Sequence, residues 1–325
     1  MESDKIKKTM EKQGYRFVGN HSAVKICRWT KKSLRNEGDC YKEKFYGIKS
    51  HLCCQITPWL GCNNQCVHCW RPIEFNFNKL IESRKIDSVS EIIDGGVGAQ
   101  KKLLVGFKKS SRKAKQMSKV DMQKWREAQE PMNFAISLSG EPMIYDQIGE
   151  LIGELRKRGK TSFLVTNGLN PKKILELKDK NYLPTQLYVS VNSSNRKNYK
   201  KFHRSSVKDA WEKLNRTLEI LPLLNCRTVF RINLIKGLNM NEKNVKEFAQ
   251  LIKKSKPMFV ELKGFMSVGF ARERLGYDKM PWHNDVIEFA EKLSKETRLK
   301  ILGEHERSCA VVLGKSKKDL KITSQ

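Results

Sequence analysis

Residues 58–70 read Pro-Trp-Leu-Gly-Cys-Asn-Asn-Gln-Cys-Val-His-Cys-Trp and carry three cysteines with the spacing C-x3-C-x2-C. A short apolar run, residues 55–60, leads into them and predicts a strand. Three thiolates on one loop can hold three irons of a 4Fe-4S cubane and leave the fourth iron open for another ligand. Cys62, Cys66 and Cys69 therefore predict an iron-sulfur cluster at the end of the first core strand.

Zinc is the alternative metal for this loop. A structural zinc ion takes four ligands, commonly from two separated pairs of residues. His68 or one of the upstream cysteines could supply the fourth ligand, so the spacing alone leaves zinc open.

The composition predicts a folded protein of the cytoplasm. The chain has 325 residues, 39% of them hydrophobic, which is enough for one large α/β core or two smaller ones. We expect neither a membrane span nor export, because no apolar run approaches about eighteen residues and the N-terminus lacks the apolar segment of a secretory signal. Nine cysteines in a reducing compartment indicate metal or redox ligands rather than disulfides.

The charge balance is strongly basic. Lys and Arg number 64 against 35 Asp and Glu, a formal net charge of +29 that attracts polyanions such as RNA. A well-solvated surface explains the same composition, so charge by itself leaves both interpretations open. The candidates for RNA contact are two basic stretches, residues 101–119 and residues 196–204, the second of which also carries Tyr199 and Phe202.

Apolar runs alternate with amphipathic stretches along most of the chain. Repeated βα units predict parallel strands joined by right-handed crossovers, and the strands are apolar enough for both sheet faces to be buried. Six units predict an α/β fold, an incomplete (β/α)6 TIM-like barrel, although a doubly wound sheet gives the same pattern. The expected strands are residues 55–60, 133–138, 161–165, 186–191, 228–235 and 259–265, and the expected helices are residues 89–107, 148–158, 171–179, 207–221, 242–255 and 283–297.

Three regions are expected along the chain. Residues 1–53 form a basic and polar N-terminal extension that carries the upstream cysteines. Residues 54–270 form the barrel, and residues 271–325 form a C-terminal helix, short strands and a basic tail. Ligands should gather at the carboxyl ends of the parallel strands.

Polar residues end three of the expected strands. A glycine there permits close approach of a ligand, a carboxylate can accept from an ammonium or fix the loop, and hydroxyl and amide groups can hold polar ligand atoms. Each residue is also explained as a turn residue that satisfies local backbone groups. The set comprises Ser139, Gly140, Glu141 and Pro142 after the second strand, Thr166 and Asn167 after the third, and Ser190 and Asn192 after the fourth.

The cysteine spacing, its place after the first strand and the βα units that follow resemble the radical S-adenosylmethionine (SAM) superfamily. The resemblance implies that the open iron binds the amino and carboxylate groups of SAM and that an electron from the cluster yields a 5'-deoxyadenosyl radical. It also implies that residues 139–142 pair with the SAM amino group and that the polar ends of the next strands hold its ribose and methionine oxygens.

The upstream half of the chain narrows the family. Several stretches resemble the tRNA 4-demethylwyosine synthases, from about residue 10 to about residue 314. The resemblance departs at His68, where many members carry an aromatic residue, and at Asn192, where an aspartate is usual. The stretches are Gly-Tyr-Arg-Phe-Val-Gly-Asn-His-Ser-Ala-Val-Lys-Ile-Cys at 14–27, Cys-Tyr-Lys-Glu-Lys-Phe-Tyr-Gly-Ile at 40–48, Ser-His-Leu-Cys at 50–53, Cys-Trp-Arg at 69–71 and Glu-Leu-Lys-Gly-Phe-Met-Ser-Val-Gly at 261–269.

The resemblance implies a defined reaction on RNA. Members of this family make a tricyclic base from N1-methylguanosine at position 37 of tRNA-Phe, and they take two carbons from pyruvate. The radical removes a hydrogen from the N1-methyl group, and the resulting carbon radical adds to the pyruvate carbonyl carbon. The carboxyl carbon then leaves, and the ring closes with loss of water. Position 37 lies beside the anticodon, so the anticodon loop is the expected partner.

The resemblance also assigns the upstream cysteines and a lysine. It implies that Cys27, Cys40 and Cys53 hold a second 4Fe-4S cluster, whose open iron binds pyruvate. Lys42 matches a lysine for which the family suggests a Schiff base with pyruvate, a role that needs the neutral amine and that Glu43 would oppose. Without the family, buried free cysteines and an ordinary surface lysine explain these residues as well.

Eukaryotic members of the family carry a flavodoxin-like domain that is absent from this sequence, so we expect electrons from a separate flavodoxin or ferredoxin. We also expect a monomer. Two rival functions remain at this point. The first is another radical SAM enzyme with an auxiliary 4Fe-4S cluster that acts on a peptide or a small metabolite. The second is a non-catalytic RNA-binding protein that holds zinc or a structural cluster.

Overall fold

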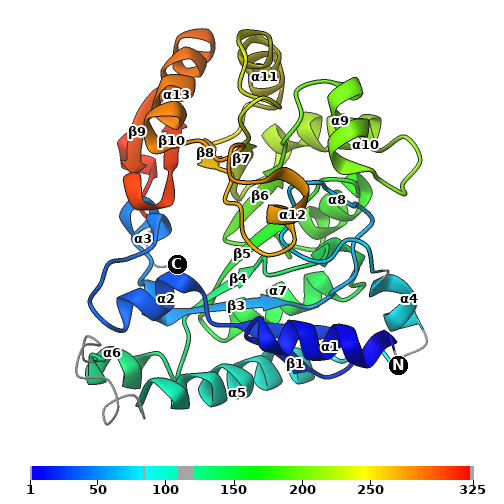
Figure 1. Cartoon of the computed structure of the whole chain (residues 1–325), viewed down its shortest axis with the longest axis vertical. Coiled ribbons are helices and arrows are strands. Elements are labelled where there is room, and N and C mark those ends of the chain that lie inside the picture. The colour runs from blue at the N-terminus through cyan, green and yellow to red at the C-terminus, as the bar shows by residue number, and fades with distance from the viewer. Residues whose placement is uncertain (1, 76, 83–84, 109–119, 323–325) are drawn as a thin grey trace. The chain divides into compact units, whose positions relative to one another are not determined.

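The computed structural model describes residues 2–75, 77–82, 85–108 and 120–322 (Figure 1). The chain divides into two compact units. Unit 1 comprises residues 1–62 and 75–164, and unit 2 comprises residues 63–74 and 165–325. We predicted three consecutive regions with boundaries after residues 53 and 270. That division differs in kind from these two units, each of which combines separate segments, and it stays a prediction. No helix among the described residues is long and apolar enough to cross a membrane.

Unit 1 contains the first strands of the chain. Strands β1 (Tyr15–Val18) and β2 (Ser22–Lys25) form an antiparallel hairpin, and β2 pairs antiparallel with β3 (Cys53–Thr57). β3, β4 (Asn133–Ile136) and β5 (Thr161–Thr166) are parallel to one another. All four residues of β4 are buried, as expected for a parallel strand covered on both faces.

Helices flank these strands within unit 1. Helix α5 (Val89–Lys108) packs against β1, β2 and β3 and also contacts α7 (Ile148–Lys157). The Asp121 side chain caps α6 by accepting from the backbone N–H groups of Gln123 (3.0 Å) and Lys124 (3.1 Å). The remaining helices of the unit are α1 (Glu2–Lys12), α2 (Arg28–Ser33), α3 (Tyr41–Tyr46), α4 (Phe77–Glu82) and α6 (Met122–Glu127).

Unit 2 contains the later strands. β6 (Gln186–Ser190), β7 (Arg227–Leu234) and β8 (Phe259–Gly264) are parallel. β10 (Ala310–Gly314) runs antiparallel to β8 and pairs on its other side with β9 (Lys300–His305), so the order is β6-β7-β8-β10-β9. The antiparallel pair therefore ends the sheet of this unit.

The helices of unit 2 contact one another in chain order, with α8 against α10, α10 against α11, and α11 against α13, whose axes stand side by side in Figure 1. Asparagine side chains begin three helices of this unit: Asn170, Asn195 and Asn241 each accept from a backbone N–H three residues later. The helices are α8 (Pro171–Asp179), α9 (Arg196–His203), α10 (Ala210–Ile220), α11 (Glu242–Ser255), α12 (Ala271–Leu275) and α13 (His283–Thr297).

The predicted α/β fold is confirmed, and all six predicted strands form with shifted ends. The helices predicted at 171–179, 242–255 and 283–297 form with those bounds, and the other three predicted helices form with shifted ends. The β1–β2 hairpin was not predicted, because its strands are only four residues long and show too little of a period. Residues 196–203 were predicted only as a basic cluster and form helix α9. This helix matters for the site, because it contacts the cysteine loop.

Candidate functional site

The C-x3-C-x2-C loop begins at the last residue of unit 1 and continues into unit 2. Cys62 ends the first unit, and Cys66 and Cys69 lie on the segment that opens the second. The Cys69 N–H donates to the Cys66 carbonyl at 2.9 Å, so these two cysteines share one tight turn. None of the three forms a disulfide, so each can lose its proton and ligate iron as the thiolate.

The end of helix α9 holds this loop within unit 2. The N–H groups of Gln65 and Val67 donate to the carbonyls of His203 and Phe202, each at 2.9 Å. The last carbonyls of a helix have no partner inside the helix, and here the loop supplies two of the missing donors. The His203 ring also reaches the loop, because its Nδ1 lies 3.2 Å from the Sγ of Cys66.

Arg274 on helix α12 gathers carbonyls of the same loop. Its guanidinium donates to the carbonyl oxygens of Val67 (3.0 Å), Cys69 and Arg71 (3.3 Å). It also pairs with Glu74 at 2.8 Å. A planar guanidinium carries five donors, so one side chain can bind several carbonyls at once. Arg274 therefore fixes the backbone on both sides of Cys69.

Asn192 and His68, the two departures from the family pattern, contact each other. The Asn192 Nδ2 lies 3.1 Å from the His68 Nε2, and the Asn192 Oδ1 accepts from the Asn233 N–H at 2.9 Å. Burial, and then the nearby charge of Arg274, lower the pKa of His68 to about 4. His68 is therefore neutral near pH 7. The contacts that the structure gives for Asn192 hold it against the cysteine loop and β7.

Thr166 and Asn167, at the end of β5, bind local backbone groups. The Thr166 Oγ1 accepts from the Gly168 N–H, and the Asn167 Oδ1 accepts from the Leu169 N–H, each at 3.1 Å. The Asn167 Nδ2 also donates to the Asn63 side chain at 2.7 Å, which ties this strand end to the cysteine loop. Ser190, the last residue of β6, is half-buried.

Residues 139–142 lie against the segment that leads to the first cysteine, within unit 1. Gly140 has a φ of +71°, and a Cβ at this position would lie 1.9 Å from the carbonyl oxygen of Trp59. The Glu141 N–H donates to the Gly61 carbonyl at 2.8 Å. The Glu141 carboxylate accepts from the N–H of Met143 at 3.1 Å, and Pro142 begins the short 3-10 turn that this contact caps. The glycine is therefore required by a close backbone approach.

The upstream cysteines come together in unit 1 from three separate segments. Cys27 precedes α2, Cys40 precedes α3, and Cys53 begins β3. Burial raises the pKa of the Cys53 thiol to about 12, with a further contribution from Cys27 and an opposing one from Lys42. Burial likewise raises the pKa of Cys40, and both Cys27 and Cys53 add to the rise. Such mutual effects require three thiols near one another and near Lys42.

Lys42 is a buried residue, with 8% of its surface exposed. Its Nζ lies 4.9 Å from the centroid of the Phe163 ring. The neighbouring Glu43 is engaged elsewhere, because its Oε2 accepts from the Ser50 N–H (2.7 Å) and from the Ser50 hydroxyl (2.6 Å). The interpretation of Lys42 as an ordinary surface lysine is therefore wrong.

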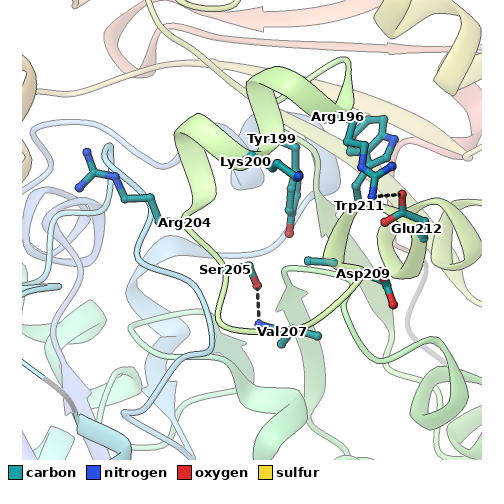
Figure 2. Close-up of a pocket in the computed structure, with 10 residues that line it drawn as sticks. Arg196, Tyr199, Lys200, Arg204, Ser205, Val207, Asp209, Trp211 and Glu212 are labelled. Carbon is teal, nitrogen blue, oxygen red and sulfur yellow. Dashed lines mark hydrogen bonds and ion pairs between the residues drawn. The ribbon is translucent and has the colours of Figure 1, made fainter.

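A pocket of about 350 Å³ opens between α9 and the start of α10 (Figure 2). Figure 2 shows Tyr199 pointing from α9 toward the segment that carries Ser205 and Val207. Arg196 pairs with Glu212 at 3.2 Å on one side of it. Cations and aromatic rings therefore line one cavity. Its lining residues are Arg196, Tyr199, Lys200, Arg204, Ser205, Val207, Asp209, Ala210, Trp211 and Glu212.

Comparison with protein families divides the chain in two. Residues 56–249 match the radical SAM superfamily, and residues 254–315 match a family described as wyosine base formation. An S-adenosyl-L-methionine-dependent tRNA 4-demethylwyosine synthase from Pyrococcus horikoshii is 45% identical over 89% of this chain and 82% of its own length. The chain belongs to the tRNA 4-demethylwyosine synthase family. An Arabidopsis thaliana member is 39% identical over 96% of this chain but only 47% of its own length.

Solved structures of the family share the fold. A structure of TYW1 with a lysine-pyruvate adduct bound has a TM-score of 0.84 and 31% identity, and it covers 99% of this chain and 98% of that one. The crystal structure of archaeal TYW1 has a TM-score of 0.78 and 30% identity, with 98% and 99% coverage. The predicted radical SAM fold and family are therefore confirmed.

Membership in this family implies SAM and one 4Fe-4S cluster. The donor set of the loop fits such a cluster, because it offers three cysteines outside any disulfide at the spacing a cubane requires. Among the described residues, no three His, Cys, Asp or Glu side chains meet closely enough to bind one metal ion. A 4Fe-4S cluster does not require three side chains to converge on one ion, because each cysteine binds a different iron.

His203, Arg274 and Asn63 are site residues that the sequence did not predict. His203 and Arg274 lie 137 and 205 residues along the chain from the cysteines they contact. His203 stands inside a basic stretch that was interpreted as an RNA surface, and Arg274 lies on a helix that was not predicted. No local sequence pattern predicts a contact between residues so far apart along the chain. Of the other predicted RNA surface, residues 109–119 lie outside the described residues.

Proposed function

We propose that this chain converts N1-methylguanosine-37 of tRNA-Phe, with pyruvate, into 4-demethylwyosine. Membership in the family supports this class of reaction. The observation that supports pyruvate as the second substrate is the burial of Lys42 beside Cys40 and Cys53. TYW1, a structural neighbour, has been seen with a lysine-pyruvate adduct. A protein that only bound RNA would have no use for a buried amine among thiols.

The first part of the proposal concerns the radical. Cys62, Cys66 and Cys69 would hold the 4Fe-4S cluster, which with SAM supplies a 5'-deoxyadenosyl radical. The chain's own residues position this chemistry: Arg274 and the end of α9 hold the loop backbone. The SAM contacts are proposed at Ser139, Gly140, Glu141 and Pro142, and at Thr166, Asn167, Ser190 and Asn192.

The contacts of those residues refine the proposal. Glu141 caps a local turn, and Asn192 is bound to His68, so both hold their loops in shape. Backbone carbonyls and side-chain atoms that are not already engaged would then make the direct contacts with SAM. Exclusion of water and alignment of the N1-methyl group are the protein's further contributions.

The second part concerns pyruvate. We propose that Cys27, Cys40 and Cys53 hold a second 4Fe-4S cluster and that Lys42 forms a Schiff base with pyruvate. The neutral Nζ attacks the keto carbon, the carbinolamine loses water, and a C=N bond results. A buried position disfavours the ammonium form, and the Glu43 carboxylate accepts hydrogen bonds from Ser50. The phenyl ring of Phe163 borders the amine.

The third part concerns the RNA partner. Helix α9 carries Lys197, Lys200 and Lys201, all exposed, and the half-buried Trp211 lines the pocket of Figure 2 together with Arg196 and Lys200. Tyr199 and Phe202, which were predicted to stack on bases, are buried, so Trp211 is the ring that we propose for stacking. Phosphate groups pair with lysine and arginine, and unpaired bases stack on aromatic rings. We propose that this surface binds the anticodon stem-loop. We also propose a cytoplasmic location, because none of the cysteines forms a disulfide. A separate flavodoxin or ferredoxin as electron donor and a monomeric state are further proposals.

The decisive experiment combines substrate and reaction. Reconstituted protein is incubated anaerobically with reductant, SAM, pyruvate and tRNA-Phe that carries N1-methylguanosine, and the nucleosides are read by mass. We expect the tricyclic nucleoside, and we expect none from tRNA that lacks the methyl group. Formation of 5'-deoxyadenosine without any new nucleoside would favour a radical SAM enzyme with a different substrate. Absence of both would favour a non-catalytic RNA-binding protein.

A further inference from the structure

The imidazole of His203 is held in one orientation beside the cysteine loop. It is the last residue of α9 and is 3% exposed. The Tyr199 ring stacks on it with centroids 4.4 Å apart and planes 24° apart. The His68 ring meets it edge to face at 5.8 Å. Two neighbouring rings therefore fix the direction in which the nitrogens of His203 point.

The two nitrogens of His203 have different surroundings. Nδ1 lies 3.2 Å from the Cys66 Sγ, within the range of a hydrogen bond to sulfur. Nε2 is buried and has no hydrogen-bond partner in the part of the chain that the structure describes. A neutral imidazole carries one N–H. The proton is therefore better placed on Nδ1, where an acceptor stands, than on Nε2.

The backbone keeps this contact in register. Gln65 and Val67, on either side of Cys66, donate to the carbonyls of His203 and Phe202. Farther along, the Ser206 N–H donates to the Asn63 carbonyl at 2.9 Å. The end of α9 and the cysteine loop are therefore joined by backbone hydrogen bonds. These bonds hold His203 and Cys66 next to each other, so that Nδ1 can reach Sγ.

We propose that His203 is a positioning residue whose Nδ1–H donates to the Cys66 Sγ and raises the reduction potential of the cluster on Cys62, Cys66 and Cys69. The inference rests on the proposed role of Cys66 as an iron ligand. An iron-bound thiolate carries no proton, so it can only accept. A hydrogen bond to a cluster sulfur withdraws negative charge and favours the reduced cluster, and such bonds are among the factors that set cluster potentials.

The test compares three substitutions at one position. His203→Phe keeps a ring for Tyr199 to stack on but has no N–H. The side-chain amide of His203→Asn places an N–H near the position of Nδ1, whereas that of His203→Gln places it near Nε2. His283→Phe is the control, because His283 belongs to the same unit but hydrogen-bonds Glu304 instead.

The readout is the midpoint potential of the reconstituted full-length protein, followed by electron paramagnetic resonance. The signal that changes when SAM is added identifies the cluster concerned. We expect His203→Phe and His203→Gln to lower the potential by about 59 mV, which corresponds to a tenfold change in the reduction equilibrium. His203→Asn and His283→Phe should stay near the parent value.

Equal potentials in all variants would overturn the role of His203 and leave the proposed function intact. A parent protein with no SAM-responsive cluster would instead overturn the assignment of Cys66 itself. If His203→Phe fails to bind iron, the comparison of His203→Asn with His203→Gln decides, since both are small amides. Restoration by asparagine and not by glutamine supports the hydrogen bond, because a purely structural role would not distinguish them.

Discussion

The two cysteine trios that we propose as cluster ligands are brought together by opposite routes. Cys62, Cys66 and Cys69 lie on one loop, where chain connectivity limits their separation. Cys27, Cys40 and Cys53 stand before α2, before α3 and at the start of β3, and tertiary folding brings them together. The local trio is supported from outside by α9 and Arg274. The dispersed trio has Lys42 near Cys40 and Cys53.

The difference suggests a division of labour. A local loop can be assembled early and then oriented by distant residues, and radical chemistry needs an exact orientation of SAM. A dispersed set encloses space between its segments, and a Schiff base needs an enclosed amine. The following experiments separate the two trios, from the largest expected effect to the smallest.

Cys66→Ala should abolish formation of 5'-deoxyadenosine. The loss of one of three ligands on a single loop removes the cluster that the loop holds, and iron content should fall from about eight to about four per chain. Cys53→Ala is the matched substitution in the other trio. It should also halve the iron but keep SAM cleavage. Equal loss of 5'-deoxyadenosine in both variants would contradict a division of labour.

Lys42→Ala should abolish the pyruvate adduct that borohydride traps, because the proposed nucleophilic amine is gone. The adduct is measured by intact mass and located by peptide mapping. Lys44→Ala, an exposed lysine on the same helix α3, is the control and should keep the adduct. The first trio is untouched, so 5'-deoxyadenosine formation should persist in both. An adduct that survives in Lys42→Ala would assign the chemistry to another amine.

Gly140→Ala should destabilise the fold by about 2 kcal/mol or more, measured by chemical or thermal unfolding. The residue has a φ of +71°, and the new Cβ would lie 1.9 Å from the Trp59 carbonyl oxygen. Gly98→Ala on α5 is the control, because a Cβ there has no neighbour within 4 Å. The control should be neutral or gain up to about 1 kcal/mol. A tolerated Gly140→Ala would show that this turn is not the support for the local loop.

Lys200→Ala combined with Lys201→Ala should weaken tRNA binding modestly. The slope of log affinity against log salt should become shallower by about one for each phosphate that the protein no longer neutralises. Lys253→Ala combined with Lys254→Ala, a similar exposed pair on α11, is the control and should leave the slope unchanged. An unchanged slope in the α9 pair would remove this helix from the RNA surface.

The recognisable parts of the site are those that a short segment encodes. The loop of Cys62, Cys66 and Cys69 and the turn at Gly140 each occupy a few consecutive residues, so spacing and residue type predict them. The six core strands were predicted for the same reason. The β1–β2 hairpin escaped because its strands are too short to show a period.

Long-range contacts were outside the reach of sequence reasoning. Glu43 was expected to oppose a neutral Lys42, yet the fold turns its carboxylate to Ser50. His203 was part of a basic stretch, yet its ring points at Cys66. Which way a side chain faces depends on how its helix packs, and neither charge nor spacing carries that information.

The amino-acid sequence by itself determined the family and the α/β order of elements, and it predicts Cys62, Cys66 and Cys69 as cluster ligands, because each is encoded by residues close together in the chain. Only the tertiary structure decided that Lys42 is buried near Cys40 and Cys53, and that His203 and Arg274 contact the loop that carries Cys66 and Cys69. The physical reason is that burial and hydrogen-bond geometry are properties of packed segments, and they exist only once distant parts of the chain are in contact.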